Sequence, residues 1–155
     1  MPADPLYRAL LQQGGAFVEK ATGALSELGR RMWLSVPTLV ADTYTPTLTA
    51  VANVAASAAY VCQYSQVGEV VTVSGQVAID PTAATTLTRL GISLPVPSRL
   101  TLAEQVGGTA AQPDLAGAVA AIRGDATNDR AELAYTTAAD VANRIWSLNF
   151  SYRIL

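Results

Sequence analysis

The clearest pattern in the chain is a strict alternation of large apolar and polar residues close to its C-terminal end. Alternation with a period of two predicts a β-strand that buries one of its faces. We expect this apolar stripe to lie either in the core of a β domain or along a threefold axis between subunits. Its members are Trp146, Leu148, Phe150, Tyr152 and Ile154.

A second alternating region predicts a β-hairpin. Residues 60–65 and 71–79 both alternate, and Val67-Gly68-Glu69 between them is a turn sequence. The second strand should end at Asp80-Pro81, because proline cannot donate a hydrogen bond to the strand ladder. Cys62 falls on the face that we expect to point inward, so it is predicted to be a small buried apolar residue and not a nucleophile.

Shorter candidate strands complete a mainly β domain. Proline, glycine and aspartate separate them, and they lie at 44–51, 86–93, 105–111, 117–123 and 130–136. Short strands at regular spacing are typical of an all-β sandwich or barrel. We expect an antiparallel, jelly-roll-like β-sandwich of about eight strands, which spans 38–155 and follows a boundary near Pro37.

Residues 1–36 follow a helical pattern instead. Asp4-Pro5 is a good helix start and Gly14-Gly15 a good stop, which predicts a short helix at 5–13. From 15 to 34 apolar residues recur every three or four positions, as on an amphipathic helix. This stripe packs either on the β domain that follows or on another subunit, and the pattern alone leaves both open.

Docking to another subunit is slightly favoured for the helical segment, because a helix pair on a loose hinge needs another surface to bury its apolar side. Trp33 follows Arg30-Arg31-Met32, a composition typical of an interface anchor. Arginine at a helix C-terminus is also favourable in any protein, so this signal has two explanations. The candidate docking residues are Phe17, Leu25, Leu28, Met32 and Trp33.

Composition narrows the classes of function. Of the 155 residues 14% are charged, the net charge is −2, and there is no histidine. The most common general base and metal ligand near neutral pH is therefore missing, and scattered cations on an acidic chain argue against a nucleic-acid partner. No apolar stretch approaches the roughly 20 residues that cross a bilayer, and the N-terminus lacks the basic start of a secretory signal. We expect a soluble protein or part of a soluble assembly, with no membrane partner.

One carboxylate cluster is a candidate for chemistry. Asp125, Asp129 and Glu132 are close in sequence, and glycoside hydrolysis needs two carboxylates roughly 5 to 10 Å apart. The same segment is typical of a polar hairpin turn whose Asp and Asn side chains cap backbone groups, and this interpretation is favoured. An EF-hand is rejected, because Arg130 replaces the required glycine and Thr136 the closing glutamate; an irregular cation site is the weaker alternative. We therefore expect no catalytic residue, cofactor or metal.

From Tyr44 onward a series of short landmarks follows the chain. They are 44–49 (YTPTLT), 53–57 (NVAAS), 60–64 (YVCQY), 67–77 (VGEVVTVSGQV), 79–82 (IDPT), 90–95 (LGISLP) and 124–131 (GDATNDRA). The series resembles a β-structured domain of tailed-bacteriophage virion proteins, commonly found at the C-terminal ends of tail fibres and related proteins. It covers 43–155, with Tyr44 where a tryptophan is expected, and leaves the helical segment unmatched. The resemblance implies a homotrimeric virion component, made in the host cytoplasm, with no catalytic residues to carry over.

Three functions follow as hypotheses. The first is a short tail or head fibre whose N-terminal helices dock on the virion and whose β domain projects for host attachment. The second is a capsid-decoration protein whose β domain lies on the shell, and the third a polysaccharide-cleaving module. A decoration protein needs no separate anchor, which favours the fibre, although the short chain favours decoration. The expected partners are further copies of the chain, other tail or capsid proteins and a host surface receptor.

Overall fold

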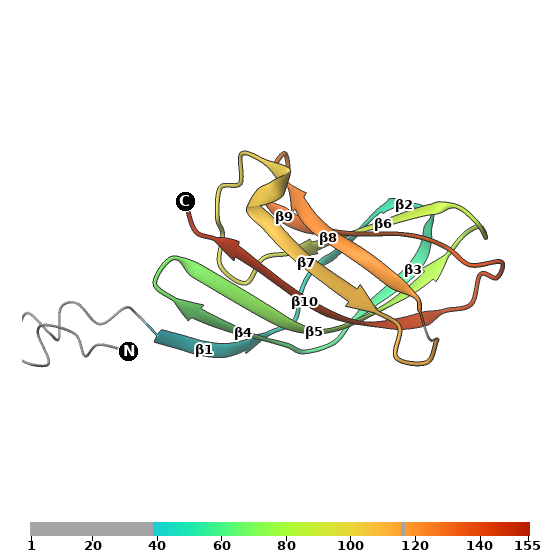
Figure 1. Ribbon diagram of the computed structural model, residues 1–155, viewed down its shortest axis with the longest axis horizontal. Helices are drawn as coiled ribbons and strands as arrows, with labels where there is room; N and C mark the ends of the chain where they lie inside the picture. The colour runs from blue at the N-terminus through green and yellow to red at the C-terminus, as the bar shows by residue number, and fades with distance from the viewer. Residues whose placement is uncertain (1–38, 116) are drawn as a thin grey trace, which may run out of the picture. The chain divides into compact units, whose positions relative to one another are not determined.

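A computed structural model describes residues 39–115 and 117–155, and strands dominate this part of the chain (Figure 1). The strands are β1 (Leu39–Tyr44), β2 (Leu48–Ala52), β3 (Val54–Ala59), β4 (Cys62–Val67), β5 (Val70–Pro81), β6 (Leu87–Ser93), β7 (Val106–Ala111), β8 (Val119–Asp125), β9 (Arg130–Thr136) and β10 (Arg144–Arg153), with a 3-10 turn η1 (Ala103–Gln105) before β7. The prediction of a mainly β fold is confirmed. The helices predicted at 5–13 and 15–34 lie outside the described residues.

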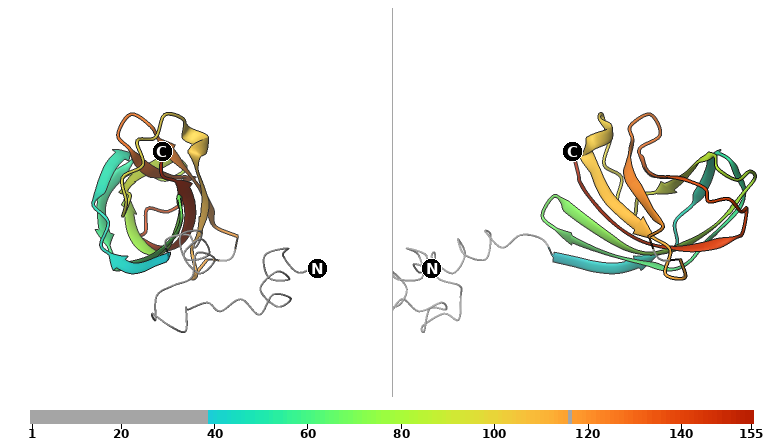
Figure 2. Two further views of the ribbon diagram at one scale, coloured as in Figure 1. Left: turned by 90° about the vertical axis from the view of Figure 1, so that its left-hand side faces the viewer. Right: turned by 45° about the vertical axis from the view of Figure 1, so that its right-hand side comes forward.

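All ten described strands belong to one antiparallel sheet. Its order is β1-β4-β5-β10-β7-β8-β9-β6-β2, and β3 pairs with β5 beside this path. Because β2 pairs with β6 and β3 pairs with β5, the chain that runs through β2 and β3 joins the two sides of the sheet. The sheet therefore curls and closes, as the end-on view in Figure 2 shows.

The predicted sandwich is wrong in its arrangement, since the described strands do not divide into two packed sheets. The physical reason is the length of β5, whose twelve residues offer one edge to two different partners. The first half of that edge pairs with β4 and the second half with β3. The pairing also continues without a break from β5 through β10, β7, β8 and β9 to β6, so the strands form one sheet.

Asn53 makes the corner between β2 and β3. Its φ of 53° is left-handed, a conformation that asparagine adopts more readily than most residues. The side-chain amide donates to the Ala83 carbonyl at 2.9 Å and to Thr88 Oγ1 at 2.7 Å, while Oδ1 accepts from the Ala83 N–H at 2.8 Å. These bonds fix the point at which the chain changes its partner strand.

The predicted hairpin is present as β4 and β5, joined at Gly68-Glu69. Gly68 has a φ of 61°, the positive value that tight hairpin turns require and that glycine adopts without strain. The last five predicted strands correspond to β6, β7, β8, β9 and β10, whereas β1 and β3 are not expected from the sequence. The described unit begins at Leu39, just after the predicted boundary at Pro37.

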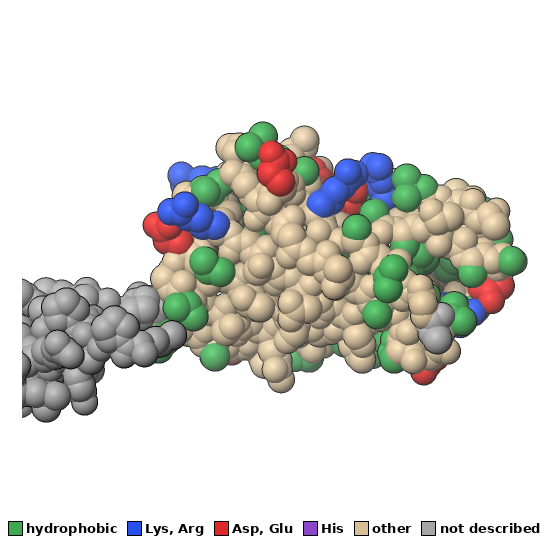
Figure 3. All heavy atoms as spheres, in the orientation of Figure 1, with side chains coloured by type: hydrophobic (Ala, Val, Ile, Leu, Met, Phe, Trp, Pro, Cys, Tyr) green, Lys and Arg blue, Asp and Glu red, His purple; other side chains and the backbone are tan. Residues whose placement is uncertain are grey.

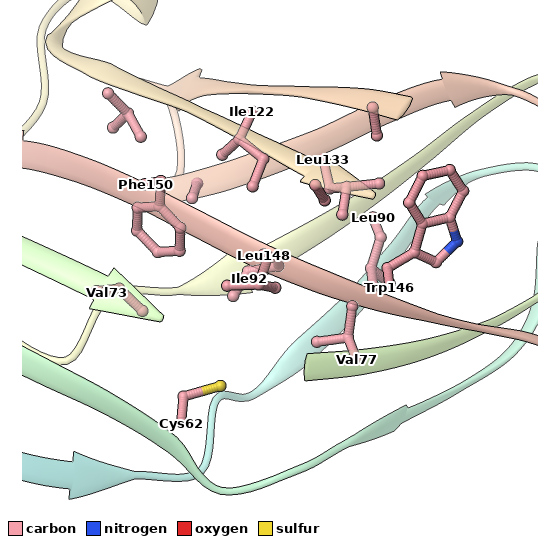
Figure 4. Close-up of a cluster of buried hydrophobic side chains, with 14 of the residues drawn as sticks. Cys62, Val73, Val77, Leu90, Ile92, Ile122, Leu133, Trp146, Leu148 and Phe150 are labelled. Atoms are coloured by element: carbon pink, nitrogen blue, oxygen red, sulfur yellow. The ribbon is translucent and has the colours of Figure 1, made fainter. Parts of the chain in front are cut away.

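The core lies inside the curled sheet, where alternate residues of the strands meet. Figure 4 shows this cluster, with Phe150 and Trp146 at its two ends and Leu148 between them. The largest fully buried side chains are Trp146, Phe150, Ile79, Leu90, Ile92 and Leu133. Burial of one such side chain contributes about 1.5 to 3 kcal/mol, so this cluster is the main source of stability.

Candidate functional site

The apolar stripe of the last strand lies in the core of the single chain. β10 directs Trp146, Leu148, Phe150 and Tyr152 inward, and each is at most 4% exposed. Ile154 follows the strand, is partly buried and packs against the same cluster. Of the two locations that the sequence allows, the structure therefore gives the core and not a shared axis.

The carboxylates Asp125 and Asp129 lie at the turn between β8 and β9. Asp125 Oδ2 accepts hydrogen bonds from Asn128 Nδ2 and Arg130 Nε, both at 2.8 Å. Asp129 accepts from two backbone N–H groups, those of Ser98 at 3.2 Å and Leu100 at 2.9 Å. The turn thus tethers the segment that follows β6, as the capping interpretation expects.

Glu132, the third member of the cluster, is buried on β9 and faces two arginines. Its Oε1 lies 3.2 Å from an Arg123 terminal nitrogen and 3.7 Å from Arg89 Nε. The first contact is a hydrogen-bonded ion pair, and the second is too long for a hydrogen bond. Every carboxylate of the cluster is therefore engaged by a neighbouring group.

The electrostatics of Asp125 do not suit a general acid. Partial burial raises the pKa of its carboxyl, but hydrogen bonds from Asn128 and Arg130 and the Arg130 charge outweigh that effect and leave the pKa below its ordinary value. A glycosidase acid needs the opposite shift, because it must hold a proton near neutral pH. Asp125 is suited to a structural ion pair.

Neither the Cys62 thiol nor a metal site supplies a reactive group among the described residues. Burial raises the pKa of the Cys62 thiol, and the side chain is 1% exposed, so the thiolate that a nucleophile needs is disfavoured. Within 39–115 and 117–155, no three His, Cys, Asp or Glu residues are arranged to hold a metal ion. In the same ranges, no helix has the length and apolar character needed to cross a membrane.

One feature that the sequence does not predict is an open cavity of about 360 Å³ beside the start of β10. Its walls include Tyr135 at the end of β9, Trp146 on β10 and Gln112 just after β7. The two aromatic rings are tilted by 48° with their centroids 4.3 Å apart. An ion pair of 2.7 Å between Arg144 and Asp140 also lines it. These residues come from three separate stretches of chain, so no local sequence signal marks them.

The chemistry of the cavity is limited. Gln112 Oε1 and Trp146 Nε1 have no hydrogen-bond partner among the described residues, but both atoms are enclosed by protein and out of reach of a ligand. Burial raises the pKa of the Tyr135 phenol, and the neighbouring Trp146 and Thr88 side chains lower this pKa by less. The phenol therefore stays neutral near pH 7. The lining carboxylate, Asp140, is paired with Arg144. The cavity therefore has room for a small molecule but holds no acid–base pair.

Comparisons with known proteins give no relative from which a role can be transferred. No family model matches the chain, and neither a curated protein nor a solved structure matches it. The predicted docking residues lie outside the described residues, so their role stays a prediction; they are Phe17, Leu25, Leu28, Met32 and Trp33.

Proposed function

We propose that the chain is a non-enzymatic structural protein of a tailed-phage virion. In this proposal it is a short trimeric fibre, docked through its helical segment at 1–36 and projecting the β unit, with host attachment as the use of the projecting part. The observation that supports it most is the position of the landmark residues, because these residues hold the fold together and do not converge on a reaction site.

Three landmarks illustrate this structural use. Asn53 makes the corner at which the sheet closes. Asp129 ties the β8–β9 turn to the segment after β6 through two backbone N–H groups. Ser93, in the landmark at 90–95, accepts the Thr47 backbone N–H at 2.9 Å and so fixes the entry to β2. A domain whose recognisable residues specify its shape is suited to a role in which shape and assembly are the function.

The polysaccharide-cleaving alternative has less support. It requires one carboxylic acid that is protonated and one carboxylate that is free to attack or to activate water. Asp125, Asp129 and Glu132 are instead held by arginines or backbone N–H groups. We expect no release of reducing ends from surface polysaccharides, and an activity that Asp125→Asn or Asp129→Asn abolishes would overturn the non-enzymatic assignment.

Virion composition tests the proposal directly. Purified particles of the phage that encodes the chain should contain it, and particles made with Leu25→Asp and Leu28→Asp together should lose it, because the charges destroy the apolar docking stripe. Lys20→Asp, a change of similar size away from that stripe, is the matched control and should leave occupancy unchanged. Absence of the chain from wild-type particles contradicts the proposal, while normal occupancy of the double variant contradicts docking by 1–36.

Imaging of the same particles separates the fibre from capsid decoration. Density that disappears from the tail or from a projecting head fibre when the chain is lost supports the fibre. Density lost evenly over the shell supports a decoration protein that stabilises the capsid. The helical segment predicted at 1–36 favours the first result, since a decoration protein binds the shell through its β domain and needs no anchor.

A further inference from the structure

One side of the curled sheet has a centre without charged residues that extends over six adjacent strands, with Arg153 and Arg123 at its edges. This outer face consists of the side chains that point away from the core on β1, β4, β5, β10, β7 and the first half of β8. Its central row is a set of cross-strand partners, Thr43, Gln63, Ser74, Asn149, Thr109 and Ala121. The row beside it, from Ala41 to Gly107, is also uncharged and ends at Arg123.

Large apolar side chains are exposed at two opposite corners of the outer face. Leu39, Val67 and Val70 are neighbours across β1, β4 and β5, and they are 70%, 50% and 49% exposed. Val119 at the start of β8 is 70% exposed and lies beside Ala111 on β7. Single exposed apolar residues are normal on a protein surface, but here they flank one continuous uncharged area.

The outer face is also hollowed. Residues of β1, β4 and β5, among them Thr43, Gln63 and Ser74, line a groove of about 380 Å³; the one charged residue in its lining is Asp42, whose carboxylate accepts the backbone N–H of Thr43. Figure 3 shows the same side of the unit as a broad expanse without charged atoms, with the arginines and acidic residues gathered toward its margins. On an ordinary protein surface roughly 25 to 35% of the residues are charged, so a face of this extent would include several charged side chains.

We propose that the outer face is the contact surface between copies of this chain. Charged residues are depleted at the centres of protein interfaces, whereas the margins are polar. Ion pairs between Arg153 and Glu69 and between Arg123 and Glu132 lie at the margins of this face. With neighbouring strands about 4.8 Å apart and same-face residues about 6.7 Å apart, the face covers roughly 600 Å², close to the roughly 800 Å² of accessible surface that each partner buries in a stable interface.

A second copy fits this face better than the chain's own amphipathic segment at 15–34. A helix that buries an apolar stripe needs a continuous apolar groove. Here the apolar residues lie at opposite corners, and hydroxyl and amide groups such as those of Ser74 and Asn149 occupy the centre. Such groups both donate and accept hydrogen bonds, so polar groups of a neighbouring copy can satisfy them, and they cost far less to desolvate than charges. The trimeric stoichiometry rests on the proposed function, whereas the position of the surface rests on these residues.

Cysteine labelling in the full chain tests the surface. Thr109→Cys places a thiol at the centre of the outer face, and Thr49→Cys places the same change on the exposed surface of β2, outside it. Cys62 is the chain's single cysteine and is buried, so it gives little background. We expect alkylation of Thr109→Cys to slow several-fold as the protein concentration rises through the micromolar range, while Thr49→Cys reacts rapidly throughout.

Each other result overturns the proposal in a recognisable way. Rapid labelling of both variants at all concentrations shows that nothing covers the face. Protection of Thr109→Cys in a protein whose mass in solution is that of one chain shows that the chain's own residues 1–36 cover the face. If the cysteine variant fails to fold, the masses of two lysine variants in solution test the surface instead. The proposal requires Asn149→Lys to have the mass of one chain and Thr49→Lys to keep the wild-type mass. If the chain is found in virions but Thr109→Cys labels freely, the proposed function stands and the proposed contact surface is wrong.

Discussion

The two faces of β10 share one strand and the same neighbouring strands, yet their side chains differ in burial and in polarity. The inner face carries Trp146, Leu148 and Phe150, which are buried against the rest of the core. The outer face carries Ser147, Asn149 and Ser151, which are partly or fully exposed and uncharged. Alternation specifies which face is the core. It says nothing about what meets the other face, and there the absence of charge is the informative signal.

The largest expected effect comes from the inner face. Phe150→Ala removes a fully buried ring, and truncation of an aromatic in a core costs about 3 to 5 kcal/mol. That loss approaches the whole stability of a typical domain, so we expect insoluble expression or a collapse of the melting temperature. Ser151→Ala, the neighbouring residue on the outer face, is the matched control and should change stability by less than about 1 kcal/mol. Two harmless substitutions would contradict the assignment of the faces.

Two adjacent glycines on β7 allow the two faces to be compared again, with a smaller expected loss of stability. A Cβ atom at Gly108 would lie 2.4 Å from the Asn149 carbonyl oxygen and 2.6 Å from the Phe150 Cα, so Gly108→Ala forces β7 and β10 apart. We expect a loss of about 1 to 3 kcal/mol in denaturant unfolding. Gly107→Ala faces outward with nothing within 4 Å and should be close to neutral. Equal losses in the two variants would show that the close approach is absent.

On the inner face, the hydroxyl of Tyr152 is hydrogen-bonded to the backbone of Val96. The hydroxyl donates to the Val96 carbonyl at 2.7 Å and accepts from the Val96 N–H at 3.1 Å. Tyr152→Phe leaves both backbone groups without this partner and should cost roughly 1 to 2 kcal/mol. Urea unfolding at pH 8 measures this cost, and a change below the experimental error would mean that water replaces the hydroxyl.

Burial raises the pKa of Tyr152 to about 12, above the ordinary value of about 10 for a free tyrosine. The neutral phenol is therefore favoured in the folded state, and its contribution is complete below about pH 10 and lost as the pH rises to about 12. Wild-type stability should fall across this window, and Tyr152→Phe should fall less. Burial also raises the pKa of Tyr44, which keeps part of the dependence in the variant.

The β8–β9 turn belongs to neither face and shows a smaller effect with the opposite pH dependence. The lowered pKa of Asp125 means that the ionised carboxyl stabilises the fold above about pH 4 and loses this contribution as the pH falls through its folded pKa. Asp125→Asn should cost about 1 kcal/mol at pH 7 and nothing at low pH. Asp114→Asn, at an exposed carboxyl, is the control. A cost that persists in acid would assign the effect to packing.

The sequence predicts those elements whose alternation is long and uninterrupted. β5 and β10 fall in this class, because most of their inward positions are large and apolar and most of their outward positions polar. β3 is missed because its sequence, VAASAA, offers small residues on both faces and no contrast for a period of two. Closure of the sheet is missed as well, since it depends on the left-handed corner at Asn53 and on β5 having two partners along one edge.

The candidate sites divide in the same way. The capping role of Asp125 and Asp129 is a local property of a polar turn and is visible in the sequence, although the contact of Asp129 with Ser98 and Leu100 is not. The outer face is a property of the sheet order, because Gln63, Asn149 and Thr109 lie in one row only when β4 pairs with β5, β5 with β10 and β10 with β7. No pattern within a single strand shows that six strands present one uncharged surface.

The most direct test of the central claim, that the inner face holds one chain together and the outer face joins copies, is thermal unfolding over a tenfold range of concentration. The wild-type midpoint should rise with protein concentration, because assembly stabilises the folded chain. Asn149→Lys places a charge at the centre of the outer face, so its midpoint should be lower and independent of concentration. A wild-type midpoint that does not change with concentration, or a variant midpoint that rises as steeply as the wild type's, would contradict the account.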